Sequence, residues 1–134
     1  MSALDPVERL REALKGPLPG HDRFLELSGY KRPDLEKARQ LDPPPRESAV
    51  LALLHPHEGV WHTLLMLRPP YEGVHGGQVS FPGGRREPED ESLEGTAPRE
   101  FMEETGARGT AIEVSGTLTS VYIPPSRSVV TRYV

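Results

Sequence analysis

The stretch GGRREPEDESLEGTAPREFMEETGA, residues 83–107, places a dense run of carboxylates behind a pair of glycines. Within it, Glu100, Glu103 and Glu104 stand at positions i, i+3 and i+4 of an expected helix, which puts them on one helix face. Like charges at this spacing repel by about 0.2–0.5 kcal/mol per pair. Mg²⁺ or Mn²⁺ turns that repulsion into coordination, because these hard cations prefer carboxylate oxygens and waters. The stretch therefore indicates either a divalent-metal site or a solvated acidic face.

The residues around the glutamates favour the metal site. Gly83 and Gly84 follow a proline and can bring a backbone carbonyl or amide close to a metal or phosphate. Arg99 can orient one glutamate through a charge-assisted hydrogen bond. A proline costs about 3 kcal/mol inside a helix but is tolerated in the first turn. We therefore expect the helix to begin near Pro98, or to be kinked there, and to end at a Gly106 cap.

Length and composition limit the classes of protein that this chain can be. Its 134 residues suffice for one domain with a single core. A net charge of −4 argues against binding of a nucleic-acid backbone, and the absence of cysteine excludes disulfides and thiolate metal sites. The longest apolar runs are too short for a membrane span, and no secretory signal is visible. We expect a cytoplasmic protein with neither a nucleic-acid nor a membrane partner.

The pattern of apolar residues divides the chain into two parts. Residues 1–47 predict an amphipathic helix over 4–15 and then a proline-rich, irregular lead-in, with a short helix possible at 33–41. The ordered domain is expected over residues 48–134. Its predicted extended segments are 48–55 and 60–68 as a hairpin, 78–82, 112–123 and 128–134. Because the chain ends on Val134 within an apolar run, we expect C-terminal residues of the domain to be missing.

Residues 99–107, REFMEETGA, resemble the REUxEExGU half of the Nudix box, in which U is a bulky apolar residue. Counting back from Arg99 puts Glu91 at the glutamate of the first half, while Gly84 lies one residue early and gives G-x6-E. Residues 64–84, LLMLRPPYEGVHGGQVSFPGG, resemble the pattern LLTxRSxxLRxHxGQVSFPGG of the coenzyme A pyrophosphatase branch. The YIPPS segment at 122–126 is similar to one common in the same branch.

This resemblance implies an α/β Nudix fold, a mixed sheet flanked by helices in an α/β/α sandwich, with its C-terminal part missing from this chain. It also implies hydrolysis of a nucleoside-linked pyrophosphate with Mg²⁺ or Mn²⁺ as cofactor. The expected metal ligands are Glu100, Glu104, Glu103 and the Gly84 carbonyl. The expected catalytic set is Glu103, as third ligand or general base, with Arg99 and Glu91 orienting the site.

The candidates for substrate binding are Arg68, His75, Gln78 and Gly83. A plain loop histidine and a surface arginine are the competing interpretations of His75 and Arg68. Glu72 and Gly73 replace the leucine and arginine of the branch pattern, which removes one cation for holding an anionic substrate.

Three functions stay open at this point. The first is hydrolysis of coenzyme A or its thioesters to adenosine 3′,5′-bisphosphate and 4′-phosphopantetheine. The second keeps this chemistry but acts on a nucleotide sugar, a dinucleotide or a nucleoside triphosphate. The third is a non-catalytic Nudix-like module that binds nucleotides or a partner. A small nucleotide-type molecule is the expected partner, and a homodimer is one candidate assembly.

Overall fold

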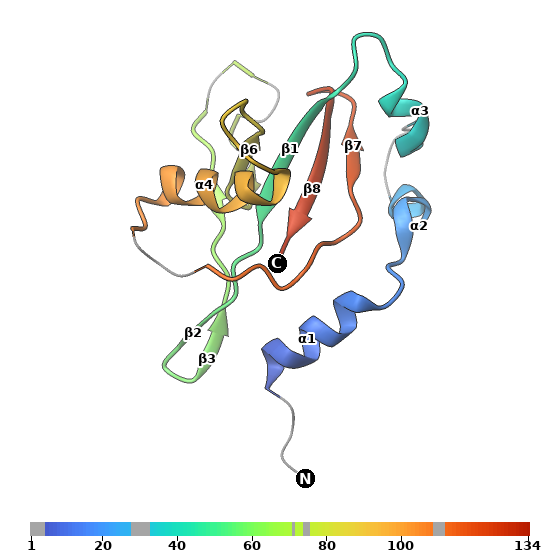
Figure 1. Cartoon of the computed structure of the whole chain (residues 1–134). Helices are drawn as coiled ribbons and strands as arrows, with labels where there is room; N and C mark the ends of the chain where they lie inside the picture. Colours follow the sequence, from blue (N-terminus) through green and yellow to red (C-terminus); the bar gives the residue numbers. More distant parts are fainter. Residues whose placement is uncertain (1–4, 28–32, 71, 74–75, 109–111) are drawn as a thin grey trace.

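The computed structural model describes residues 5–27, 33–70, 72–73, 76–108 and 112–134 (Figure 1). The helices of this part of the chain are α1 (Pro6–Lys15), α2 (Gly20–Leu27), α3 (Leu35–Arg39) and α4 (Leu93–Thr105). Its strands are β1 (Arg46–Leu51), β2 (His55–His57), β3 (Val60–His62), β4 (Met66–Leu67), β5 (Val79–Ser80), β6 (Gly83–Arg85), β7 (Val121–Ile123) and β8 (Ser128–Tyr133). None of the helices described is both long and apolar enough to cross a bilayer.

The central sheet is mixed and has the strand order β6-β1-β8-β7. β1 runs parallel to β8 and antiparallel to β6, and β7 runs antiparallel to β8. Two parallel neighbours need a crossover between them, and this crossover carries α4. The predicted α/β fold with a mixed sheet is confirmed.

Alternation of side chains gives the sheet two different faces. One face packs against α4 through a core of buried residues: Ala49, Leu51, Ala97, Phe101 and Tyr133. Farther along the same face, Ala38 of α3 packs on Tyr122 and Val129. The opposite face carries alternate residues of the same strands, such as Ser48, Val50 and Val130. The core and the cleft described below therefore lie on opposite faces of one sheet.

Helix α4 begins at Leu93, ahead of the start predicted near Pro98. Ser92 caps it, because its hydroxyl accepts a hydrogen bond from the Gly95 amide at 3.1 Å. Pro98 lies inside the helix. The helix ends as predicted at Gly106, whose φ of 75° is left-handed and whose amide donates to the Met102 carbonyl. A good N-cap and the burial of Ala97 and Phe101 outweigh the hydrogen bond lost at the proline.

Several strands are shorter than the apolar runs that predicted them. β1 ends at Leu51, and the predicted hairpin consists of β2 and β3 alone, joined by a turn in which Glu58 and Gly59 both have positive φ. Within 112–123 only β7 is a strand, beside a single bridge between Thr117 and Tyr133. Helix α2 lies in the lead-in that the prolines predicted to be irregular. Apolar composition located these segments but not the points where pairing stops.

Gly83 provides a test of the close packing between β6 and β1. A Cβ at this position would overlap the Ala49 carbonyl oxygen and lie 2.7 Å from the Val50 Cα. Because overpacking of this kind costs roughly 1–3 kcal/mol, we expect Gly83→Ala to lower the free energy of unfolding by about that amount in urea titrations. Gly95→Ala is the control: its Cβ would make an ordinary contact, 3.5 Å from the Ser92 hydroxyl, and helix propensity favours alanine. Equal stability of the two variants would contradict the packing described.

Candidate functional site

The glycine pair of β6 lies directly against the acidic face of α4. A Cβ on Gly84 would fall 2.6 and 2.7 Å from the two carboxylate oxygens of Glu100, so only glycine permits this approach. One residue earlier, the Gly83 amide donates to Glu104 Oε1 at 3.1 Å. Two of the predicted metal-binding glutamates therefore contact two consecutive glycines of one strand.

The register of β6 decides which glycine carbonyl is available. Leu51 donates to the Pro82 carbonyl at 2.9 Å and Arg86 donates to the Glu47 carbonyl at 3.0 Å, so even-numbered residues of this segment direct their backbone groups to β1. Gly84 belongs to that set. Gly83 instead faces the open edge of the sheet, where Glu104 lies. The expectation that Gly84 offers its carbonyl to a metal disagrees with this register, which favours the Gly83 carbonyl.

Arg99 connects the carboxylates of the site. Its Nε and Nη2 donate to the two oxygens of Asp90 at 2.6 and 2.9 Å, a bidentate pair. Its Nη1 lies 3.2 Å from an oxygen of Glu100 and 3.2 Å from an oxygen of Glu103. Nη2 also donates to the Arg85 carbonyl at 3.1 Å, which joins α4 to the end of β6. One guanidinium therefore bridges three carboxylates, reduces the repulsion among them, and connects the helix to the strand.

Asp90, and not Glu91, is the carboxylate that orients Arg99. The Asp90 side chain is only 5% exposed and also accepts hydrogen bonds from the Glu87 amide and the Thr96 hydroxyl, each at 2.9 Å. The Glu91 side chain is exposed, and among the described residues the hydrogen bond to Glu91 is made at its backbone carbonyl, by Arg86 at 3.3 Å. The contacts suited to the orienting role that was predicted for Glu91 are therefore made by its neighbour, Asp90. Counting forward from Gly84 would have found it, because G-x5 ends on Asp90.

The contacts shift the acidity of these groups in opposite directions. The hydrogen bonds from Arg99, followed by that from the Glu87 amide, hold the pKa of Asp90 well below its usual range. The hydrogen bonds to Asp90 raise the pKa of Arg99 above its usual value. Burial raises the pKa of Glu100, whose side chain is 16% exposed; Arg99 opposes this shift, while the charges of Glu103 and Glu104 add to it. A second cation beside Glu100 would favour its charged form.

The donor types at this site fit Mg²⁺ or Mn²⁺. Carboxylates of Glu100 and Glu104 and a backbone carbonyl are hard oxygen donors. Over the residues described, no group of three or more aspartate, glutamate or histidine side chains is arranged to hold a metal ion. The structure brings Glu100 and Glu104 to the glycine pair, while Glu103 is 59% exposed and pairs with Arg99. Mg²⁺ commonly uses one or two carboxylates and completes its shell with waters and substrate phosphates.

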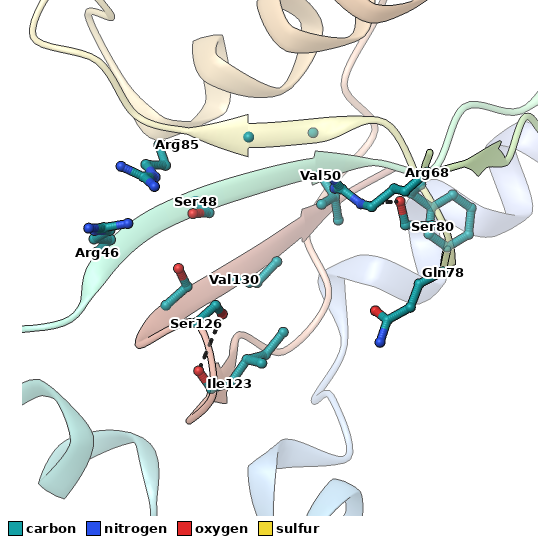
Figure 2. Close-up of a pocket in the computed structure, with 14 residues that line it drawn as sticks. Arg46, Ser48, Val50, Arg68, Gln78, Ser80, Arg85, Ile123, Ser126 and Val130 are labelled. Carbon is teal, nitrogen blue, oxygen red and sulfur yellow. Dashed lines mark hydrogen bonds between the residues drawn. The ribbon is translucent and has the colours of Figure 1, made fainter. Parts of the chain in front are cut away.

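A cleft of about 480 Å³ opens along β6, β1 and β8, on the face opposite α4 (Figure 2). Three of the predicted substrate-binding residues line it: Arg68, Gln78 and Gly83. Arg68 Nε donates to the Ser80 hydroxyl at 3.2 Å, which holds that side chain at one end of the cleft. His75, the fourth, lies outside the described residues. Gly84 also lines the cleft, so the glycine pair separates it from the carboxylates of α4.

The YIPPS segment contributes to the far wall of the cleft. Ile123 and Ser126 line it, while Tyr122 is buried against α3 on the other face. Sequence reasoning missed four polar residues that also line the cleft: Arg46, Ser48, Arg85 and Ser128. The alternation of Arg46, Ser48 and Val50 in β1 was the available signal, but it identifies a shared face only after the sheet order is known.

Comparisons with known proteins agree with this geometry. The profile of the NUDIX domain matches residues 44–134. The human mitochondrial coenzyme A diphosphatase NUDT8 is 41% identical over 87 residues, which is 64% of this chain and 37% of that protein. An uncharacterized Nudix hydrolase, NudL from Yersinia enterocolitica, is 46% identical over 55 residues, covering 41% of this chain and 28% of its own length. The chain thus spans well under half the length of these curated relatives.

A solved structure supports the same assignment. The crystal structure of RenU, a Nudix hydrolase from M. smegmatis, superposes with a TM-score of 0.51 at 27% sequence identity. The match covers 66% of this chain and 58% of RenU. With the domain profile matched over residues 44–134 and the glutamates of α4 set against the glycine pair, this chain belongs to the Nudix family.

Proposed function

We propose that this protein is a Mg²⁺- or Mn²⁺-dependent pyrophosphohydrolase that cleaves coenzyme A or its thioesters to adenosine 3′,5′-bisphosphate and 4′-phosphopantetheine. One observation carries the proposal: Glu100 and Glu104 contact the same two glycines that line the cleft. A pyrophosphate lying along β6 would meet the carboxylate-bound cation at this strand. When bound, the cation neutralises the diphosphate and supplies an activated water.

The protein's own residues divide the remaining work. Glu100, Glu104 and the Gly83 carbonyl are the proposed holders of the cation. Glu103, exposed and within reach of Arg99, is the proposed third ligand or general base. Arg99 is a positioning residue, because it links Glu100 and Glu103 to Asp90 in the loop before α4. Asp90 takes over the orienting role first given to Glu91.

The choice of coenzyme A rests on two supports. The pattern at 64–84 resembles the coenzyme A pyrophosphatase branch, and a relative named coenzyme A diphosphatase is 41% identical over 87 residues. Arg68 and Gln78, which belong to that pattern, lie in the cleft. Glu72 and Gly73, in place of leucine and arginine, favour a second candidate, another nucleoside diphosphate derivative. A cytoplasmic location and a homodimer remain predictions.

Substitution of the two glutamates tests the proposal. We expect Glu100→Gln and Glu104→Gln each to lower kcat/KM for coenzyme A with Mg²⁺ by at least about 100-fold, because loss of even indirect metal partners costs roughly 10–100-fold. Chromatography of released adenosine 3′,5′-bisphosphate measures the rate. Glu94→Gln, on the exposed first turn of the same helix, is the control and should keep wild-type turnover. ADP-ribose, a dinucleotide and a nucleoside triphosphate run in parallel; exclusive turnover of one of these would reject coenzyme A.

The ion pair between Asp90 and Arg99 predicts how the stability of the fold depends on pH. The pKa of Asp90 is lower in the folded than in the unfolded protein, so its charge stabilises the fold above the usual carboxyl range. Asp90→Asn should therefore lower Tm at pH 7. The gap to wild type should narrow as the pH falls below about 4, where the unfolded-state carboxyl becomes protonated. Calorimetry from pH 7 to 3.5 measures both.

Glu91→Gln is the matched control for this ion pair, because it removes the neighbouring exposed carboxylate. It should leave Tm close to wild type across the range. A larger loss in Glu91→Gln than in Asp90→Asn would contradict the assignment of Asp90 as the partner of Arg99.

A further inference from the structure

One end of the cleft carries two arginines and two serines, and none of the four belongs to the proposed metal site. Arg46 and Arg85 lie side by side there, near Ser48, whereas Arg68 and Gln78 lie at the opposite end (Figure 2). We call the group of Arg46, Ser48, Arg85 and Ser128 the basic end of the cleft.

The register of the sheet brings these four residues together. Ser48 of β1 pairs with Arg85 of β6 in the antiparallel ladder. Arg46 of the same strand pairs with Ser128 of β8 in the parallel ladder. Because Arg46 and Ser48 are two residues apart in β1, all four side chains project from one face. The basic end is therefore built on three strands of the central sheet and not on a loop.

The polar side-chain groups of the basic end have no partners within the described part of the chain. Neither guanidinium takes part in an ion pair or side-chain hydrogen bond there, although most other arginines of the same part do. Ser48 and Ser128 are each 8% exposed where they line the cleft, and neither hydroxyl is hydrogen-bonded to another described residue. The two guanidiniums and the two hydroxyls therefore offer hydrogen-bond donors to the cleft, which suits a ligand that accepts hydrogen bonds.

Glu47, Glu87 and Asp90 line a second hollow together with Arg46 and Arg85, but each of these carboxylates forms its ion pair with another arginine. Glu47 projects from the other face of β1 and lies 3.6 Å from Arg39. Glu87, beyond the end of β6, lies 3.8 Å from Arg99. The basic end therefore keeps a local positive charge in a chain whose net charge is −4. An anion with several acceptor oxygens matches two guanidinium forks and two hydroxyls.

We propose that the basic end binds a phosphomonoester of the substrate, separate from the pyrophosphate that is cleaved. Arg85 follows Gly84 directly, so a phosphate held there lies within about one nucleotide of the glycine pair. Coenzyme A carries such a group, the 3′-phosphate on its adenosine, while ADP-ribose does not. This inference rests on the proposed function and adds the determinant that selects substrates bearing this phosphate.

The test compares kcat/KM for coenzyme A with that for 3′-dephospho-coenzyme A. The wild-type protein should prefer coenzyme A by at least about tenfold, the amount that one charged hydrogen bond supplies. Arg46→Gln and Arg85→Gln should each reduce this preference about tenfold, toward a ratio of one. Both side chains are exposed, so neither change should affect folding. Arg9→Gln, an exposed arginine of α1, should keep the wild-type ratio. Equal rates on the two substrates, or a ratio unchanged in both variants, would overturn the proposal.

A binding measurement separates failure of the basic end from failure of the proposed function. Turnover of neither substrate by the wild-type protein would reject the function alone. Calorimetry with metal-free protein then decides, using adenosine 3′,5′-bisphosphate and adenosine 5′-monophosphate as probes. Tighter binding of the bisphosphate that disappears in Arg46→Gln and Arg85→Gln supports the basic end. Equal affinity for the two probes, or bisphosphate binding that survives both changes, rejects it.

Discussion

The close approach of helix α4 to strand β6 is the constraint on which the rest of the site depends. The Glu100 carboxylate fills the space that a side chain on Gly84 would need, and the Gly83 amide is held by Glu104. A larger residue at Gly84 would push helix and strand apart, and one at Gly83 would push β6 away from β1. Ala97 and Phe101 hold the same helix on the neighbouring strands β1 and β8 through the apolar core. The apolar packing of α4 and the placement of its carboxylates therefore depend on the same position of the helix.

An acidic helix face in this position needs a cation even before a metal binds. Arg99 supplies it, since one guanidinium contacts Asp90, Glu100 and Glu103. Buried Asp90 holds that arginine in place and is in turn held by the Glu87 amide and the Thr96 hydroxyl. The oxygens of Glu100 and Glu104 that meet the glycines remain oriented together. The site is thus partly preorganised, which lowers the cost of assembling it around a cation.

The two sides of the glycine pair carry side chains of opposite charge. On the side of α4 are carboxylates, which suit a divalent cation. On the other face of the sheet is a cleft whose charged side chains are arginines: Arg46, Arg68 and Arg85. In the proposed function, the second side would attract an anionic substrate and the cation would offset the repulsion of the first. The two glycines of β6, which carry no side chains, would allow a diphosphate to contact both.

The sequence by itself determined the helix with its glutamates, the glycine pair and the family, because helical spacing and glycine freedom are local properties. It could not choose between Asp90 and Glu91, because counting forward from Gly84 through the Nudix box reaches Asp90, whereas counting back from Arg99 reaches Glu91. Only the folded loop shows that the Asp90 carboxylate is the enclosed one. It proposed the Gly84 carbonyl as a metal ligand, whereas strand pairing, which decides which way Gly83 and Gly84 face, favours the Gly83 carbonyl. It missed the basic end because Arg46 and Ser128, distant in the chain, become neighbours only through the parallel pairing of β1 with β8.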